Sequence, residues 1–132
     1  MEDIMPDDLR AATLMQEHHG PVVMMNLLKF KQQTADGRSG AEAYNAYGGA
    51  VAKMISGVGG EVVWWGLPKA VLIGGDADRW DAVAMVRYPT PAALFQMMEL
   101  EEYKAIHSDR EAALERTALL ACVEIPLRDP AE

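Results

Sequence analysis

The residue types best suited to proton transfer and anion binding fall close together at Tyr103, His107 and Arg110. On an unbroken helix, side chains spaced by four and seven positions lie on one face, so these three would face the same neighbour. His107 is the candidate acid or base, because imidazole changes its charge near neutral pH. Arg110 would hold an anionic substrate, or simply pair with Glu111 or Asp109 on the surface. The alternative is a polar contact between helices that stabilises a kink at Ser108.

Three further residues are candidate ligand contacts. Asn26 is the uncharged polar residue of an otherwise apolar strand, and a buried amide without partners would cost about 1–3 kcal/mol. It would therefore either bind a ligand, orienting it together with Tyr103, or tie two strands together. Tyr88, at the end of a strand, would point its hydroxyl into a cleft or into water. Trp64 would contact a ligand, unless it serves only the core or a subunit interface.

No cofactor or metal is indicated. His18 and His19 are adjacent, so they diverge in any regular structure. The sequence Asp76-Ala77-Asp78 lacks the rest of a calcium loop and predicts a turn. Glycines 57–60 follow a helix rather than a strand, which is not the arrangement of a nucleotide-binding loop.

The elements that must position these residues follow from periodicity, capping residues and turn residues. Ser39 and Glu42 form a capping box, and Ser108 and Glu111 predict a second one. The order of elements after the first helix is β-α-β-β-α-(α)-β, which is typical of the ferredoxin-like, split β-α-β α+β fold. The predicted elements are a helix over 6–17, a strand over 22–30, a helix over 40–57, a strand over 61–73 interrupted at 66–68, a strand over 81–88, a helix after Thr90-Pro91, a short helix over 109–116 and a strand over 117–125.

The strands are apolar on both faces, although helices can cover only one face of such a sheet. Val62 and Trp64 alternate with Val63 and Trp65, for example. The second face would leave a large apolar patch in water, so we expect a second copy of the chain to cover it, forming a homodimer. The alternative is a curled sheet that the N-terminal helix closes by itself.

Length and net charge restrict the number of domains and the kinds of partner that the chain can have. The 132 residues predict one domain, with a helical extension over 1–20, the ferredoxin-like core over 21–126 and a tail over 127–132. A net charge of −8 disfavours nucleic acid and anionic membrane surfaces as partners. The acidic start and the lack of a membrane-spanning stretch lead us to expect a cytoplasmic protein. The single Cys122 lies in an apolar run and predicts a small buried side chain.

Five stretches, in this order, carry a resemblance to a known family: PVVMMNLLKFK, AYNAYGGAVAKMISGVGGEVVWWG, AVLIGG, WDAVAMVRYPTPAALFQMM and EEYKAIHSDREAALERTALLA. From Pro21 to Ala121 the chain resembles domain of unknown function family 1330 (DUF 1330), placed in the dimeric α/β-barrel superfamily. The chain departs from the family pattern at Glu101, where a proline is usual, and at Ala113, where a glycine is often found.

The resemblance implies two protomers whose sheets face each other, with a ligand cleft between sheet and helices in each. The family's activity is not established, and its structural relatives include cofactor-free monooxygenases and an isomerase. One hypothesis is therefore a cofactor-free reaction on a small apolar or aromatic substrate, with His107 as acid or base. A second is a binding module without chemistry, for which the nine methionines suit adaptable apolar contacts. A third is a purely structural dimer.

Overall fold

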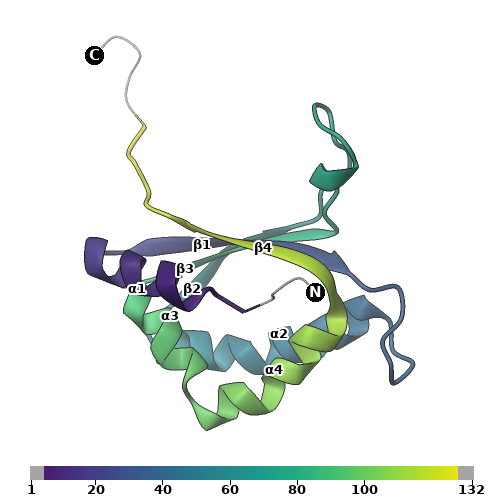
Figure 1. Cartoon of the computed structure of the whole chain (residues 1–132), viewed down its shortest axis with the longest axis horizontal. Helices are drawn as coiled ribbons and strands as arrows, with labels where there is room; N and C mark the ends of the chain where they lie inside the picture. Colours follow the sequence, from purple (N-terminus) through teal and green to yellow (C-terminus); the bar gives the residue numbers. More distant parts are fainter. Residues whose placement is uncertain (1–4, 128–132) are drawn as a thin grey trace.

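The chain forms a four-stranded antiparallel sheet with its helices on one face, in a computed structural model that describes residues 5–127 (Figure 1). The strand order is β2-β3-β1-β4, which is the ferredoxin-like order that the sequence predicts. The elements are α1 (Asp8–Glu17), β1 (Val22–Phe30), α2 (Gly40–Gly57), β2 (Glu61–Gly66), the short 3-10 helix η1 (Asp76–Asp78), β3 (Ala82–Tyr88), α3 (Pro91–Met98), α4 (Glu101–Ala113) and β4 (Leu114–Cys122).

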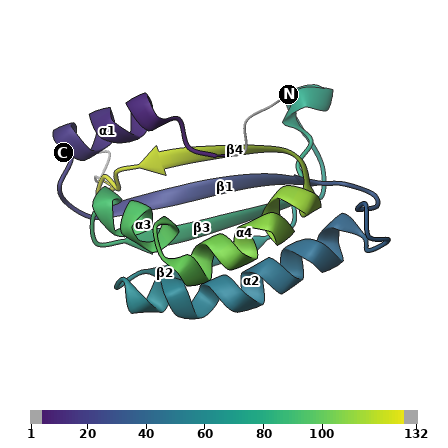
Figure 2. The ribbon, with the colours of Figure 1, turned by 60° about the horizontal axis from the view of Figure 1, so that its bottom comes forward.

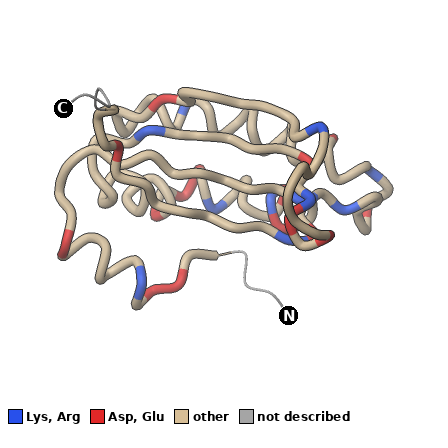
Figure 3. Tube along the Cα trace, turned by 90° about the horizontal axis from the view of Figure 1, so that it is seen from above, with Lys and Arg blue, Asp and Glu red and all other residues tan. Residues whose placement is uncertain are grey.

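The strand register assigns every sheet residue to one of two faces. Asn26 lies opposite Ala84 of β3 and Leu119 of β4, on the face that the helices cover. Met25 lies opposite Met85 and Leu120, on the face that no helix covers (Figure 1). Seen from above, charged residues lie mainly near the strand ends and in the loops (Figure 3). The central part of this uncovered face is apolar, as the sequence predicts.

The Ser39–Glu42 capping box starts α2 as predicted, at a point where three elements converge. The amide of Gly40 donates to Lys31 O over 2.9 Å, and the amide of Lys31 donates to Ala113 O over 2.8 Å. A methyl group on Gly40 would collide with both carbonyl oxygens. This contact joins the end of β1, the start of α2 and the end of α4, so it fixes how the helices sit beneath the sheet.

The predicted helix start at Ser108 is wrong, because α4 runs without interruption from Glu101 to Ala113. Its buried residues, Tyr103, Arg110 and Ala113, continue on one face across Ser108. Packing of that face against α2 therefore overrides the local capping signal. The last strand begins correspondingly early, at Leu114 rather than at residue 117, and ends at Cys122.

The predicted strand over 69–73 is also wrong. β2 ends at Gly66, opposite Val83, which is close to the start of β3 at Ala82. Beyond this point no neighbouring strand remains to pair with, and Pro68 has no N–H to donate. Residues 67–79 instead form an exposed arm that projects from the uncovered side of the sheet (Figure 1). Leu72 and Ile73 on this arm are more than nine-tenths exposed, at 92% and 96%.

The N-terminal helix does not close the sheet. Asp7 caps α1 by accepting the amide of Arg10, so the helix starts at Asp8 and not at Pro6. α1 lies beside β4, near α3, away from the uncovered face (Figure 2). The acidic residues 1–4 and most of the predicted tail, 128–132, lie outside the described residues. Within residues 5–127, no helix is both long enough and apolar enough to span a membrane.

Two glycine substitutions test this account of α2. Gly40→Ala should lower the free energy of unfolding by about 1–3 kcal/mol, because the new methyl group meets backbone oxygens that cannot rotate away. Gly49→Ala, an exposed position with no atom within 4 Å of the added carbon, should raise it by up to about 1 kcal/mol. Urea denaturation of both variants measures the difference. Equal effects would contradict the convergence of three elements at Gly40.

Candidate functional site

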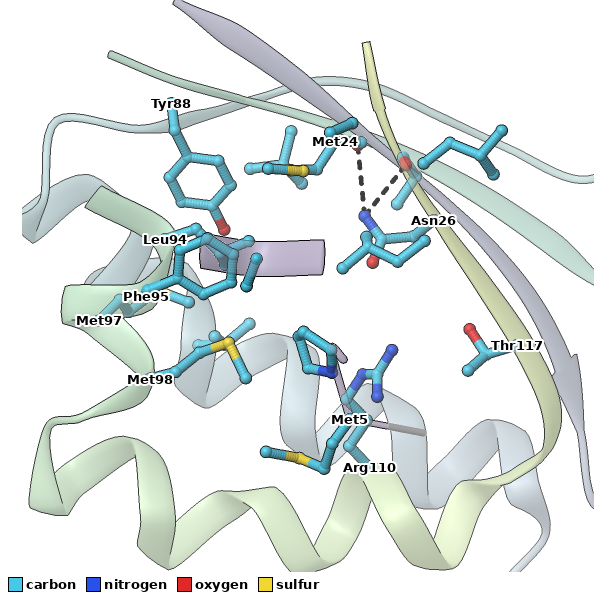
Figure 4. A pocket seen from close by; sticks show the side chains of 18 of the residues that line it. Met5, Met24, Asn26, Tyr88, Leu94, Phe95, Met97, Met98, Arg110 and Thr117 are labelled. Carbon is cyan, nitrogen blue, oxygen red and sulfur yellow. Dashed lines mark hydrogen bonds between the residues drawn. The ribbon is translucent and has the colours of Figure 1, made fainter. Parts of the chain in front are cut away.

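A cavity of about 700 Å³ lies between the sheet and the helices. Strands β1, β3 and β4 form its roof, and α2, α3 and α4 form its floor and one end (Figure 4). Residues 5–7 and α1 line the side near β4. Most of the wall is apolar; its larger apolar side chains are Leu14, Met24, Val51, Ile55, Val86, Leu94, Phe95, Met97 and Met98.

Small side chains at two of the strand positions that face the helices leave room for the cavity. Ala84 and Ala121 line the roof, where larger residues would reach the floor. The tyrosines below cannot move up to fill the space, because the hydroxyls of Tyr47 and Tyr103 hydrogen-bond to each other over 2.9 Å. The aromatic ring of Tyr44 packs against Tyr47, with ring centroids 5.4 Å apart.

Arg110 is the buried cation of this site. Arg110 is only 7% exposed and lines the cavity from α4 (Figure 4), together with Tyr103, which lies seven positions earlier on the same face of the helix. Tyr44 lines the same cavity, and the charge of Arg110 acts to lower the pKa of its hydroxyl. Burial nevertheless has the larger effect and raises the pKa of Tyr44.

The Nδ2 group of Asn26 is hydrogen-bonded within the sheet, whereas its Oδ1 faces the cavity. Its Nδ2 donates to Met24 O over 3.3 Å and to Ala84 O over 3.4 Å, which ties β1 to β3. Carbonyl oxygens can only accept, so this orientation of the amide is fixed and Oδ1 points away from them. Oδ1 makes no hydrogen bond within the described chain. Both interpretations of Asn26, strand tie and ligand acceptor, are therefore compatible with its position.

The tyrosine hydroxyls of the cavity are hydrogen-bond donors and acceptors at neutral pH rather than bases. Burial raises the pKa of Tyr88, which is only 3% exposed and lines the cavity above Leu94 and Phe95 (Figure 4). Burial, and next the neighbouring Tyr103, raises the pKa of Tyr47. The Tyr88 hydroxyl has no hydrogen-bond partner among residues 5–127, so it remains available to a ligand.

His107 does not reach this cavity. It lines a neighbouring pocket of about 280 Å³, which Tyr103 and the N-terminal residues Met5 and Pro6 also line. Nε2 of His107 lies 2.9 Å from Glu111 Oε1 in the arrangement of an ion pair, without the angle of a good hydrogen bond. Desolvation lowers the pKa of His107 below its usual 6.5, although Glu111 acts in the opposite direction. Although α4 is uninterrupted, the predicted trio is divided between two pockets: Arg110 lines the larger, His107 lines the smaller, and Tyr103 borders both.

Trp64 lies on the other face of the sheet. It is paired with Met85, its ring packs over Gly66, and it is 52% exposed. Trp65 faces the helices instead and stacks on Tyr44, with ring centroids 6.3 Å apart. A bulge between Val62 and Trp64 sets which of the two indoles turns toward the helices. Trp64 is therefore available to a partner on the uncovered face and not to a molecule in the cavity.

Sequence reasoning missed Tyr44, Tyr47 and Arg10 as cavity residues. The two tyrosines are on the apolar stripe of α2, where they resemble ordinary core residues. Only the spacing of α2 from the sheet shows that they border open space. Cys122 is half-buried rather than buried, on the uncovered face opposite Val23. Among the described residues, no group of three acidic, histidine or cysteine side chains has the arrangement of a metal site.

Comparison with known proteins places the chain among others of similar sequence and fold. A family model described as a domain of unknown function, DUF1330, matches residues 38–123. None of the curated proteins matches the chain. RPA0582, a protein of unknown function from Rhodopseudomonas palustris, has 32% sequence identity and a TM-score of 0.88; the alignment covers 96% of this chain and 100% of that one.

Two more distant structures share the fold alone. A hydroxynitrile lyase from Passiflora edulis has 11% identity and a TM-score of 0.60, over 83% of this chain and 98% of its own. A protein of unknown function from Bacteroides fragilis, described as dimeric and of ferredoxin-like fold, has 13% identity and a TM-score of 0.52, over 80% and 97%.

The lowered pKa of His107 predicts the sign of a pH effect on stability. Between its folded pKa and 6.5, the unfolded chain binds more protons at this position than the folded chain does. The stability of the wild-type protein relative to His107→Gln should therefore fall as the pH is lowered from about 7 to about 5.5. Urea titrations of both proteins across this range measure the difference. A relative gain on acidification would mean that the Glu111 ion pair dominates.

Proposed function

This chain belongs to the DUF1330 family, and we propose that it binds a small, largely apolar or aromatic molecule in the cavity between its sheet and its helices. The observation that carries this proposal is the cavity itself. Its volume of about 700 Å³ is within the usual range for small-molecule sites, and most of its wall is apolar with a few inward polar groups. A chain that served only as a structural dimer would have no need to keep such a space open.

The polar groups around the cavity would orient the ligand. Oδ1 of Asn26 accepts a hydrogen bond at the roof, and the hydroxyl of Tyr88 donates or accepts at the α3 end. Tyr103 and Arg110 present polar atoms from α4. Because these groups come from three different elements, a ligand that met all of them would be fixed in one orientation.

The arrangement favours binding over catalysis. Tyr47 and Tyr88, which border the cavity, stay protonated near neutral pH, since burial raises the pKa of both. His107, the residue best suited to general acid–base chemistry, lines the smaller pocket. A reaction of the isomerase or monooxygenase type would have to pass a proton through Tyr103, which borders both pockets.

We also propose that a second copy of the chain covers the uncovered face of the sheet. The centre of this face is apolar, including Met25, Met85 and the half-exposed Trp64. The charges at its ends are paired within the chain, as in Lys29–Asp81 at 3.3 Å and Arg87–Glu61 at 2.9 Å. Neutralised ends around an apolar centre suit a self-complementary, two-fold contact. The exposed arm over 67–79 projects toward the same side, where it could reach the second copy (Figure 1).

Filling the cavity tests the binding proposal. N-phenyl-1-naphthylamine, a neutral probe whose fluorescence rises in apolar surroundings, should bind the wild-type protein saturably. Ala84→Phe, which places a ring inside the cavity, should weaken binding by at least about tenfold. Ala52→Phe, on the exposed side of α2, is the matched control and should bind as the wild type does. Equal binding by all three proteins would place the probe elsewhere and contradict the proposal.

A charge placed on the uncovered face tests the proposed dimer. Met25→Asp would bury a carboxylate at the centre of the interface, so native mass spectrometry should show the monomer in place of the dimer. Leu9→Asp, on the exposed side of α1, removes an apolar side chain outside the interface and should leave the dimer intact. A monomeric wild-type protein, or a Met25→Asp dimer of unchanged stability, would refute this assembly.

A further inference from the structure

We propose that the ligand of this cavity is an amphipathic carboxylate, whose charged end binds Arg110 and whose apolar body extends between α3 and the sheet. This inference rests on the proposed binding function and specifies the chemical class of the ligand. It follows from the position of one buried positive charge in a cavity that is otherwise mostly apolar.

The electrostatic part of the argument begins with the surroundings of Arg110. Its charge acts on the ionisation of Tyr44, Tyr47 and His107, so the guanidinium lies close to all of them. Water is largely excluded here, since the Arg110 side chain is 7% exposed, and a charge interaction is stronger where the local dielectric constant is low. An anionic group placed beside this guanidinium would therefore interact with it strongly, although the whole chain has a net charge of −8.

The charged residues that line the cavity also favour an anionic ligand. Among the described lining residues, Arg10 and Arg110 are basic and Asp7 is the one acidic residue. The carboxylate of Asp7 is already used, because Oδ1 caps α1 by accepting the amide of Arg10 over 2.9 Å. Among the lining residues within 5–127, the two basic groups thus face one acidic group, which already interacts with the helix end.

The geometry of the donors favours a planar, singly charged oxyanion. A guanidinium presents its N–H groups in a plane that matches a carboxylate, which it can bind through two parallel hydrogen bonds. Tyr44 lies beside Arg110, and the Tyr47–Tyr103 pair supplies further hydroxyls at this end. A phosphate would bring about two charges to a site with one deeply buried cation, so a carboxylate matches the site better.

The apolar part of the cavity indicates the chemical nature of the uncharged part of the ligand. Figure 4 shows Arg110 rising from α4, while Tyr88, Leu94 and Phe95 stand together toward the α3 end. Between them the wall is formed largely by methionine and aliphatic side chains, among them Met24 and Met97. A ligand with a carboxylate at one end and a ring or a branched chain beyond it satisfies both regions. A dicarboxylate or a sugar acid would leave polar groups against apolar walls.

A matched ligand pair separates this inference from the proposed function. Naphthalene-2-carboxylate and naphthalene-2-carboxamide have the same shape and differ in charge, and calorimetry at low salt gives the affinity of each. The wild-type protein should bind the carboxylate at least about tenfold more tightly than the amide. Arg110→Met should lose this preference and keep its affinity for the amide. Lys53→Met, which removes one exposed positive charge from α2, should keep the preference.

The outcomes distinguish the two claims. Equal affinity of the wild-type protein for both compounds would overturn the carboxylate inference and leave the binding function intact. Binding of neither compound, together with no binding of the neutral naphthylamine probe, would overturn both claims. If Arg110→Met does not fold, Arg110→Lys decides the question, because it keeps the charge and loses the planar pair of donors. It should show a smaller preference for the carboxylate, and a preference equal to the wild type's would refute the paired geometry.

Discussion

A sheet that is apolar on both faces is the constraint on which the rest of this structure depends. The helices cover one face, and the register of β1 against β3 and β4 puts Val22, Met24 and Leu28 among the most buried residues of the chain. The other face keeps Met25, Met85 and Leu120 without a covering element within residues 5–127. Burial of apolar area stabilises the folded state in proportion to the area covered, so leaving one face in water would forfeit a large stabilising contribution.

The covered face is not completely packed, and the reason lies in the sizes of the residues on its two sides. Small residues such as Ala84 and Ala121 form the roof, while the tyrosines of the floor are tied to each other. A close-packed core would be more stable, because an empty apolar space loses dispersion contacts and costs free energy in proportion to its volume. Alanines above a hydrogen-bonded tyrosine pair give up packing for space, which fits the proposed binding of a ligand.

The buried charge of Arg110 is a second feature of the covered face that costs stability. Placing a guanidinium away from water is costly, and replacing such a group with an apolar residue often stabilises a protein. The cost is reduced here by the Tyr44 hydroxyl and by a cavity that admits a polar molecule. A helix that only needed to pack on α2 would gain more from a methionine or a leucine at this position, so the arginine fits the ligand-binding role proposed above.

The sequence by itself determined the order of the elements, the boundaries of β1, the capping box of α2 and the apolarity of both sheet faces. These features follow from period, capping and composition, which act over a few neighbouring residues. Tertiary structure decided the rest. Packing on α2 carried α4 through Ser108, and residues 69–73 extend beyond the start of β3 at Ala82, where no strand remains to pair with. A bulge turned Trp65 rather than Trp64 toward the helices. The division of Tyr103, His107 and Arg110 between two pockets, and the tyrosine floor of the cavity, depend on distances between segments far apart in the chain, which no local pattern records.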